Sequence, residues 1–296
     1  MMKPGLLKFY LTIFFIGLVS VSQAQTEGKV LENKEIQSTI LGKPVKYSVY
    51  LPEDYETSQR NYPVVYLLHG LEQNSSTWLE EGEIKSYVDN AIKNGTIPPM
   101  ILIMPDAERT WYINSFDGKV LYEDFFIKEL IPGVEKIFRI RSEKKYRGIA
   151  GVSMGGYGTF YYSLKYPDLF SAAAPLSAAV RNDSAFMKLT DEVYADRFAK
   201  VLGPVPSGGN RFTTFYRAHS IIDIVKNTQG SELSKVRYWI DCGDDDPLVE
   251  GNCIVHLMLT DKKVTNEFRV RDGAHNYIYW RSGIIDALKY IGDSFR

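Results

Sequence analysis

Gly151, Ser153 and Gly155 form a G-x-S-x-G motif near the middle of the chain. A run of apolar, largely β-branched residues over 146–152 leads into the serine, and small residues compatible with a helix follow over 156–166. A serine on such a strand–turn–helix connection projects its hydroxyl from the carboxyl edge of a sheet. Glycines on either side let the strand and the helix approach each other, because glycine has no Cβ. The motif therefore predicts that Ser153 is a nucleophile.

A serine hydroxyl needs a base to take its proton, and a histidine held by an acid can do this. The chain has four histidines. In folds with a nucleophile elbow the acid and the histidine follow the serine, which excludes His69. His275 comes directly after the last predicted strand, so we expect it to be the base. His256 lies in a predicted helix, as a packed or surface residue, and His219 is expected to contact substrate or lie on the surface.

Three consecutive carboxylates, Asp244, Asp245 and Asp246, follow the strand that precedes the histidine's strand. The G-x-x-D turn that begins at Gly243 favours Asp246 as the acid, since Pro247 can then start the next helix. Asp244 or Asp245 could instead bind a cation or cap that helix.

The negative oxygen that forms when a serine attacks an ester needs two backbone N–H donors. The residue after the nucleophile, Met154, supplies one of them. The strand over 64–68 is followed by His69-Gly70-Leu71, and we assign the second donor to the amide of Leu71. His69 is expected to shape this loop and not to act as a base.

The elements that must position these groups alternate between strand and helix. Strands are predicted over 64–68, 100–104, 146–152, 171–176, 236–242 and 266–270, and helices over 80–94, 121–138, 156–166, 248–260 and 282–290. Two further strands, 30–40 and 45–51, read as an antiparallel hairpin. Such alternation predicts an α/β fold with a mostly parallel sheet and helices on both faces. Residues 178–235 break the alternation and are expected to form a partly helical insertion packed over the sheet edge.

The composition is that of an ordinary globular protein. The 296 residues are 45% hydrophobic and 24% charged, with a net charge of −1 that gives no electrostatic reason to expect nucleic acid as a partner. The two cysteines, Cys242 and Cys253, form no metal motif, and a bridge between them is left open.

The N-terminal residues have the pattern of a signal peptide. Lys3 and Lys8 precede an apolar run over 9–21, and Ser22-Gln23-Ala24 provides small residues for cleavage. We expect residues 1–24 to be removed and 25–296, beginning at Gln25, to form a single domain that is periplasmic or secreted. An uncleaved membrane anchor is the alternative, and the apolar run is short for a membrane span.

The chain resembles the esterase D-like branch of the α/β-hydrolases, which includes carbohydrate esterase family 1 (feruloyl and acetylxylan esterases), S-formylglutathione hydrolases and mycolyltransferases. The matching pieces are Tyr66-Leu67-Leu68-His69-Gly70 with Trp78, Trp111-Tyr112 ahead of Tyr122-Glu123-Asp124, the elbow from Gly151 to Gly156, Cys242-Gly243 with Asp246, and Gly273-Ala274-His275. Together they extend over nearly all of the chain that follows the predicted leader. The extra carboxylates Asp244 and Asp245 and the insertion at 178–235 depart from the family pattern.

The resemblance implies an α/β-hydrolase fold and serine esterase chemistry with no metal or cofactor. Its substrate would carry an ester, and an exported enzyme suits feruloyl or acetyl groups on an oligo- or polysaccharide. Trp78, Trp111, Tyr112 and Tyr277 are candidate substrate contacts, although each could equally be a packed or rim aromatic.

Other functions on the same fold stay open at this point. They are a siderophore-ester hydrolase, an S-formylglutathione hydrolase, a lipase-like enzyme or general esterase, a peptidase, and a glycan-binding protein without catalysis. Fold alone does not distinguish between them.

Overall fold

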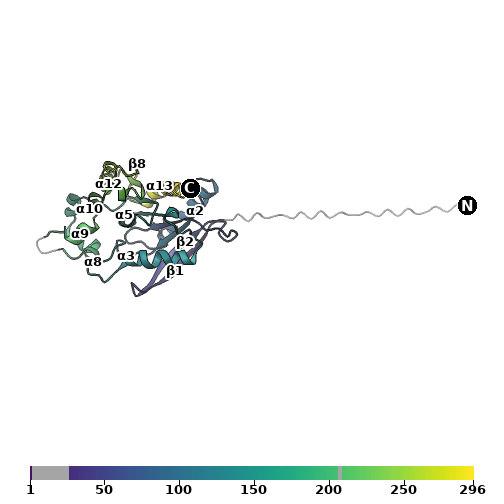
Figure 1. Ribbon diagram of the computed structural model, residues 1–296, viewed down its shortest axis with the longest axis horizontal. Helices are drawn as coiled ribbons and strands as arrows, with labels where there is room; N and C mark the ends of the chain where they lie inside the picture. Colours follow the sequence, from purple (N-terminus) through teal and green to yellow (C-terminus); the bar gives the residue numbers. More distant parts are fainter. Residues whose placement is uncertain (2–26, 206–208) are drawn as a thin grey trace.

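The computed structural model describes residues 1, 27–205 and 209–296 (Figure 1). The rest of the predicted signal peptide, 2–24, and the predicted first mature residue, Gln25, lie outside this part of the chain. Among the described residues, eight strands form a single sheet in the order β1-β2-β4-β3-β5-β6-β7-β8. The sheet, with helices on both of its faces, confirms the predicted α/β-hydrolase architecture.

The sheet begins with the predicted antiparallel hairpin and continues as parallel strands. β1 pairs antiparallel with β2, and β2 with β4, whereas all later pairs are parallel. The strands are β1 (Lys29–Ser38), β2 (Lys43–Leu51), β3 (Val64–Leu68), β4 (Ile101–Pro105), β5 (Arg147–Val152), β6 (Ala172–Leu176), β7 (Arg237–Gly243) and β8 (Asn266–Arg271). Strands β3 to β6 are buried on both faces, which explains their continuous apolar sequences.

Helices bury both faces of the sheet in two separate cores. α2 and α13 cover one face, and α3, α4, α5 and α12 cover the other. The helices are α1 (Thr77–Glu80), α2 (Ile84–Lys93), α3 (Tyr122–Phe125), the π-helical turn η1 (Phe126–Leu130), α4 (Ile131–Ile137), the 3-10 turn η2 (Lys144–Tyr146), α5 (Met154–Lys165), α6 (Asp183–Met187), α7 (Asp191–Arg197), α8 (Ala199–Leu202), α9 (Thr214–His219), α10 (Ile221–Asn227), α11 (Gly230–Leu233), α12 (Val249–Asp261) and α13 (Tyr277–Asp293).

Three predicted helices differ from the structure in their limits. The helix predicted over 80–94 begins only at Ile84, because the chain turns at Glu83, whose φ is +49°, and Glu80 belongs to the preceding helix α1. The helix predicted over 121–138 is continuous but contains η1 directly before Pro132, which has no N–H to donate. The last helix begins earlier than residue 282, because Asn276 caps it by accepting the Tyr279 amide at 3.1 Å.

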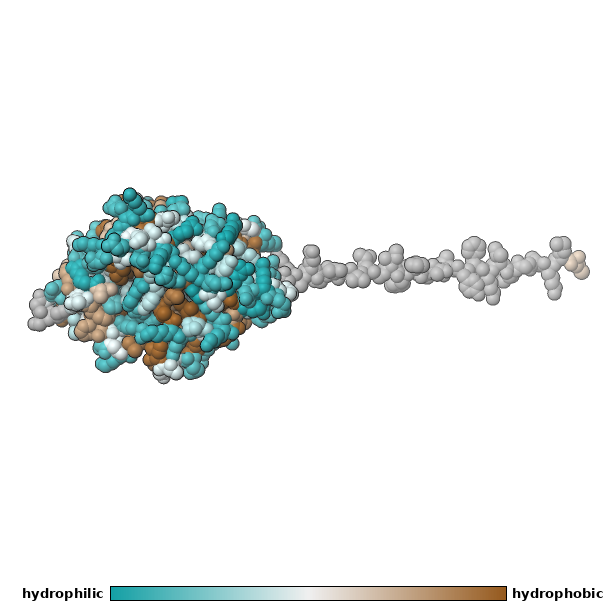
Figure 2. Space-filling model, in the orientation of Figure 1, coloured by the Kyte–Doolittle hydropathy of each residue, from teal (hydrophilic) through white to brown (hydrophobic). Residues whose placement is uncertain are grey.

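The insertion over 178–235 is helical in its described part. Helices α6 to α11 lie in it, and side chains such as Asn182 and Thr213 cap several of them. Helix α10 packs against α5, so the insertion lies beside the helix that follows the elbow (Figure 1). Polar residues cover most of the face seen in Figure 2, and hydrophobic ones gather in a few smaller areas. Within the described residues, no helix combines the length and hydrophobicity needed to cross a membrane.

Both cysteines are free thiols in the structure. Cys242 is buried on β7, and Cys253 is partly exposed on α12. The bridge that the sequence left open is therefore not formed.

Candidate active site

Ser153 lies in a strained turn between β5 and α5. Its φ of +55° and ψ of −115° lie outside the regions that most residues adopt, at a cost of about 1–3 kcal/mol. The surroundings hold this conformation, since the carbonyl of Ser153 accepts the amide of Ala179 at 2.9 Å. A Cβ on Gly155 would lie 2.5 Å from the carbonyl oxygen of Leu68. Only glycine therefore lets α5 start this close to β3, as the motif predicts.

The structure brings Ser153, His275 and Asp246 together from three distant parts of the chain. The Nε2 atom of His275 lies 2.9 Å from Oγ of Ser153, and its Nδ1 lies 2.7 Å from Oδ2 of Asp246. An ionised carboxylate can only accept, so Nδ1 donates and Nε2 is free to accept the serine proton. This is the arrangement of a base held in the correct tautomer by an acid.

Asp246 is well suited to stay ionised although it is only 1% exposed. Burial acts to raise the pKa of Asp246, but the hydrogen bond and charge of His275 outweigh it. The amide of Leu248, which donates to Oδ1 at 2.9 Å, acts in the same direction, and the pKa is lowered as a result.

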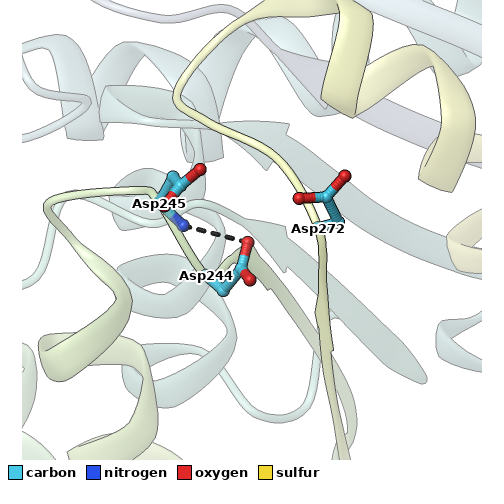
Figure 3. A group of neighbouring side chains, drawn as sticks. All are labelled: Asp244, Asp245 and Asp272. Carbon is cyan, nitrogen blue, oxygen red and sulfur yellow. Dashed lines mark hydrogen bonds between the residues drawn. The ribbon is translucent and has the colours of Figure 1, made fainter.

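The neighbouring carboxylates do not contact His275. Asp244, Asp245 and Asp272 lie together on the surface, where their oxygens fall within 4.8 Å of one another (Figure 3). Oδ1 of Asp244 accepts the amides of Asp245 at 3.1 Å and Gly273 at 3.0 Å. Asp244 thus fastens the loop that carries the acid to the loop that carries the histidine, a role that its sequence position did not indicate.

A second polar cluster anchors the loop that carries His275. Asp241 on β7 is 1% exposed and accepts hydrogen bonds from Arg271 at 3.0 Å and from the hydroxyl of Tyr279 at 2.6 Å. Arg271 ends β8 and Tyr279 lies in the first turn of α13, so both ends of the His275 loop are tied to the same carboxylate. Trp280 packs edge-on against the imidazole, with ring centroids 5.0 Å apart.

The amides of Leu71 and Met154 are placed to act as donors. Met154 is the first residue of α5, where backbone amides have no partner within the helix. Leu71 lies in the turn after β3, and its amide has no hydrogen-bond partner among the described residues. The neighbouring Gly70 amide donates to Oε1 of Gln73 at 2.7 Å and is therefore occupied.

Buried side chains fix this loop. His69, 1% exposed, accepts the amide of Ala107 on Nε2 at 2.9 Å, and its Nδ1 lies 2.7 Å from the carbonyl of Gly70. The Tyr112 hydroxyl donates to the carbonyl of His69 at 2.9 Å, and the Trp78 indole donates to that of Leu68 at 3.0 Å. His69 thus has the loop-shaping position that the sequence suggested.

The comparison with known families agrees with this geometry. The model of the family described as "Putative esterase" matches residues 38–291. The chain belongs to this esterase family.

Two curated relatives that the chain matches are longer proteins. Esterase Rv1288 of Mycobacterium tuberculosis is 37% identical over 154 residues, which cover 50% of this chain and 32% of the relative. An endo-1,4-beta-xylanase/feruloyl esterase of Xylanibacter ruminicola is 36% identical over 136 residues, or 44% of this chain and 19% of the relative. The chain therefore matches a third or less of the length of these two relatives.

Solved structures resemble the chain over most of its length. A ferulic acid esterase superposes with a TM-score of 0.78 at 28% identity, covering 92% of this chain and 100% of the other. The serine hydrolase FphF of Staphylococcus aureus gives a TM-score of 0.73 at 26% identity, covering 90% of this chain and 98% of that one. An S-formylglutathione hydrolase of the same species gives 0.67 at 25% identity, covering 89% of this chain and 98% of that one.

Two of the four predicted substrate contacts in this family member are wrong. Trp78 and Tyr112 are both 0% exposed, and their polar atoms are engaged by backbone carbonyls. They support the oxyanion loop and cannot reach a substrate. Tyr277, 7% exposed, donates to Gln73 at 2.9 Å and packs edge-on against Trp78, so it also belongs mainly to the support of the loop.

Trp111 is the predicted contact that lines a cavity. This cavity is small, with a volume of about 50 Å³, and it lies between α5 and the insertion, partly open to solvent. Six aromatic residues form nearly half of its lining, namely Trp111, Tyr157, Phe186, Phe198, Tyr216 and His219. His219, which the sequence left as a substrate contact or a surface residue, is thus a cavity residue. Burial lowers its pKa, and its Nδ1 lies 2.7 Å from the carbonyl of Phe215.

His256 is a packed helical residue. Its Nδ1 lies 2.5 Å from Oδ1 of Asn266, and its ring packs against Phe268 with centroids 5.3 Å apart. It lies on α12, away from the hydrogen-bonded group formed by Ser153, His275 and Asp246.

Proposed function

We propose that this protein is a serine carboxylic-ester hydrolase with Ser153 as its nucleophile. The observation that carries the proposal is the pair of hydrogen bonds by which His275 joins Ser153 to Asp246. Membership of the esterase family supports it. Asp246 keeps the imidazole in the tautomer that can accept a proton on Nε2.

The reaction has two halves that use the same groups. Nε2 of His275 takes the proton of Ser153 while Oγ attacks the ester carbonyl carbon, and the amides of Leu71 and Met154 bind the oxyanion. His275 then gives that proton to the leaving alcohol, which leaves the acyl group on Oγ. In the second half water attacks the acyl group, His275 takes a proton from the water, and the carboxylic acid is released with Ser153 restored.

We further propose that the substrate is a feruloyl or acetyl ester on an oligo- or polysaccharide. The aromatic residues around the small cavity between α5 and the insertion favour contact with a planar group. A second cavity of about 570 Å³, with charged residues such as Lys46 and Asp106 in its lining, lies on the other side of Ile113 and offers polar groups for sugar hydroxyls. The names of the relative from Xylanibacter ruminicola and of the solved ferulic acid esterase point the same way.

The predicted leader supports a periplasmic or secreted enzyme. The likeness to an S-formylglutathione hydrolase supports a second candidate function, hydrolysis of a thioester of glutathione. An exported enzyme would be separated from the reducing cytosol in which such thiols are kept, so we favour the polysaccharide ester.

The direct test incubates the chain from Gln25 onward with methyl ferulate, acetylated xylan and S-formylglutathione, beside the Ser153→Ala variant. Release of ferulate or acetate that is lost in the variant would support the proposal. Turnover of S-formylglutathione alone would favour the second candidate.

Two further outcomes would change the assignment. If Ser153→Ala keeps the activity of the wild type, Ser153 is not the nucleophile. Binding of xylan without turnover of any ester, siderophore ester or peptide offered would indicate a glycan-binding protein.

A further inference from the structure

The cavity between α5 and the insertion contains a positive charge. Among the described residues of its lining, Arg181 is the one with a permanent charge, and no carboxylate accompanies it. His219 is the other titratable base in the lining, and burial favours its neutral form by lowering its pKa. Apart from Ser220, the rest of the wall is apolar or aromatic.

Arg181 has no partner of its own within the described part of the chain. No carboxylate lies within ion-pair distance of its guanidinium, and no hydrogen bond joins it to a described residue. Two other arginines of the insertion are paired with carboxylates. Arg211 pairs with Asp191 at 2.5 Å, and Arg217 pairs with Asp183 at 2.7 Å and with Asp223 at 3.1 Å.

The environment of Arg181 disfavours its charge. Burial lowers the pKa of the guanidinium, and the positive charge of Arg197 acts in the same direction, whereas the negative charge of Asp246 opposes them without reversing the shift. An arginine nevertheless stays protonated in proteins, so a partly buried cation is present in the cavity. A carboxylate would compensate this charge far better than a neutral hydroxyl, because a charged pair forms a stronger hydrogen bond in a desolvated site.

The position of Arg181 links this charge to the nucleophile. Arg181 lies two residues after Ala179, whose amide donates to the carbonyl of Ser153 at 2.9 Å. Ala179 and Tyr157, which lies one helical turn after Ser153, both line the same cavity. The cavity therefore adjoins backbone that contacts the elbow, although Ser153 itself is not in its lining.

We propose that Arg181 binds a carboxylate on the substrate and makes the enzyme select esters that carry a negative charge, an inference that rests on the proposed function. The carboxylate belongs either to the acyl group or to the alcohol, as in a uronic acid sugar. The shared chemistry is a bidentate pair between a planar guanidinium and a carboxylate.

Two pairs of esters separate these sources. Methyl 4-carboxycinnamate and methyl cinnamate differ by a charge on the acyl side, whereas 4-acetoxybenzoate and phenyl acetate differ by a charge on the alcohol side. For each pair, kcat/KM is measured in the wild type, in Arg181→Met and in Arg181→Lys. Lys188→Met removes a positive charge from an exposed position of the insertion outside the cavity and is the matched control.

In one of the pairs, we expect Arg181→Met to lower the ratio of kcat/KM for the charged ester to kcat/KM for the neutral ester by about tenfold. Arg181→Lys should restore part of this ratio. The kcat/KM of Arg181→Met for the neutral esters should stay within about twofold of the wild-type value. The ratio of charged to neutral kcat/KM in Lys188→Met should also stay within about twofold of wild type. Ratios that are unchanged in Arg181→Met overturn the proposal while leaving the esterase assignment intact.

A binding measurement makes the proposal testable without turnover. Benzoate and benzamide have the same shape and differ in charge, so NMR titration of each into Ser153→Ala reports on the cavity alone. We expect benzoate to bind more tightly, with the difference lost when Arg181→Met is added. Equal affinities would contradict the proposal, even if the enzyme hydrolysed none of the four esters.

Discussion

The hydroxyl of Tyr279 donates a hydrogen bond of 2.6 Å to the buried carboxylate of Asp241. This bond joins the first turn of α13 to β7, and the His275 loop lies between Tyr279 and Arg271, which binds the same carboxylate. The position of the imidazole thus depends on a buried charge that takes no part in the chemistry.

Tyr279→Phe tests this support. Because the variant removes one hydrogen bond to a buried carboxylate, we expect the free energy of unfolding to fall by about 1–2 kcal/mol. The value of kcat should fall as well, since the histidine loop loses one of its anchors. Tyr290→Phe is the matched control on the same helix, because the buried hydroxyl of Tyr290 has no hydrogen-bond partner among the described residues. Equal losses of stability in both variants, measured by urea unfolding, would argue against this role for Tyr279.

Asp246→Asn tests the choice among the three consecutive carboxylates. An amide at this position would donate to Nδ1 and stabilise the wrong tautomer of His275, so kcat should fall by about 10⁴-fold. Asp245→Asn changes an exposed carboxylate that does not touch the imidazole and should keep kcat within about twofold. Steady-state kinetics on a short-chain aryl ester give both values. The reverse order of effects would move the acid to Asp245.

Stability should depend on pH through Asp246. Its pKa is lowered in the folded protein, so its ionised form stabilises the fold above the unfolded pKa of about 3.9. This contribution is lost as pH falls through the lower folded pKa. The difference in unfolding free energy between wild type and Asp246→Asn should therefore be largest near neutral pH and shrink below about pH 4. A difference that grows on acidification would mean that the folded pKa is raised.

Gly155→Ala tests the close approach at the elbow. Its new Cβ would meet the backbone of Leu68 at 2.5 Å, and backbone atoms can move only with β3. We expect a loss of about 3 kcal/mol in unfolding free energy and a large loss of activity. Gly42→Ala, in the turn of the β1–β2 hairpin, meets no atom within 4 Å, so its cost should be limited to about 1–2 kcal/mol for its φ of +65°. Thermal unfolding of the two variants compares a steric effect with a purely conformational one.

The sequence predicted features well where residues close together in the chain determine them. The G-x-S-x-G spacing located the elbow, and the apolar strands located the sheet, because both depend on short-range sterics and burial. The loop after β8 located His275 for the same reason. The selection of Asp246 depended on a turn pattern, and the structure adds the reason, which is that only its carboxylate reaches the imidazole.

Other features depend on packing between distant segments and could not be derived in this way. An aromatic residue near a catalytic motif can face the substrate or the core, so Trp78 and Tyr112 were placed wrongly while Trp111 lines the cavity. Arg181 lies in a segment without periodicity, and only the tertiary structure shows that it faces the cavity beside α5 without a partner. The role of Asp244 in holding Gly273 likewise depends on how two loops meet.

The two thiols have a consequence for how the fold responds to redox conditions. Burial raises the pKa of Cys242, with the charge of Asp246 acting in the same direction, so the thiol stays protonated and unreactive toward oxidants. No covalent cross-link joins Cys242 to Cys253, and the fold therefore requires no oxidation step to mature. Reducing agents therefore have no bond between these two sulfur atoms to break, and the contacts of the sheet with its helices hold the two segments in place.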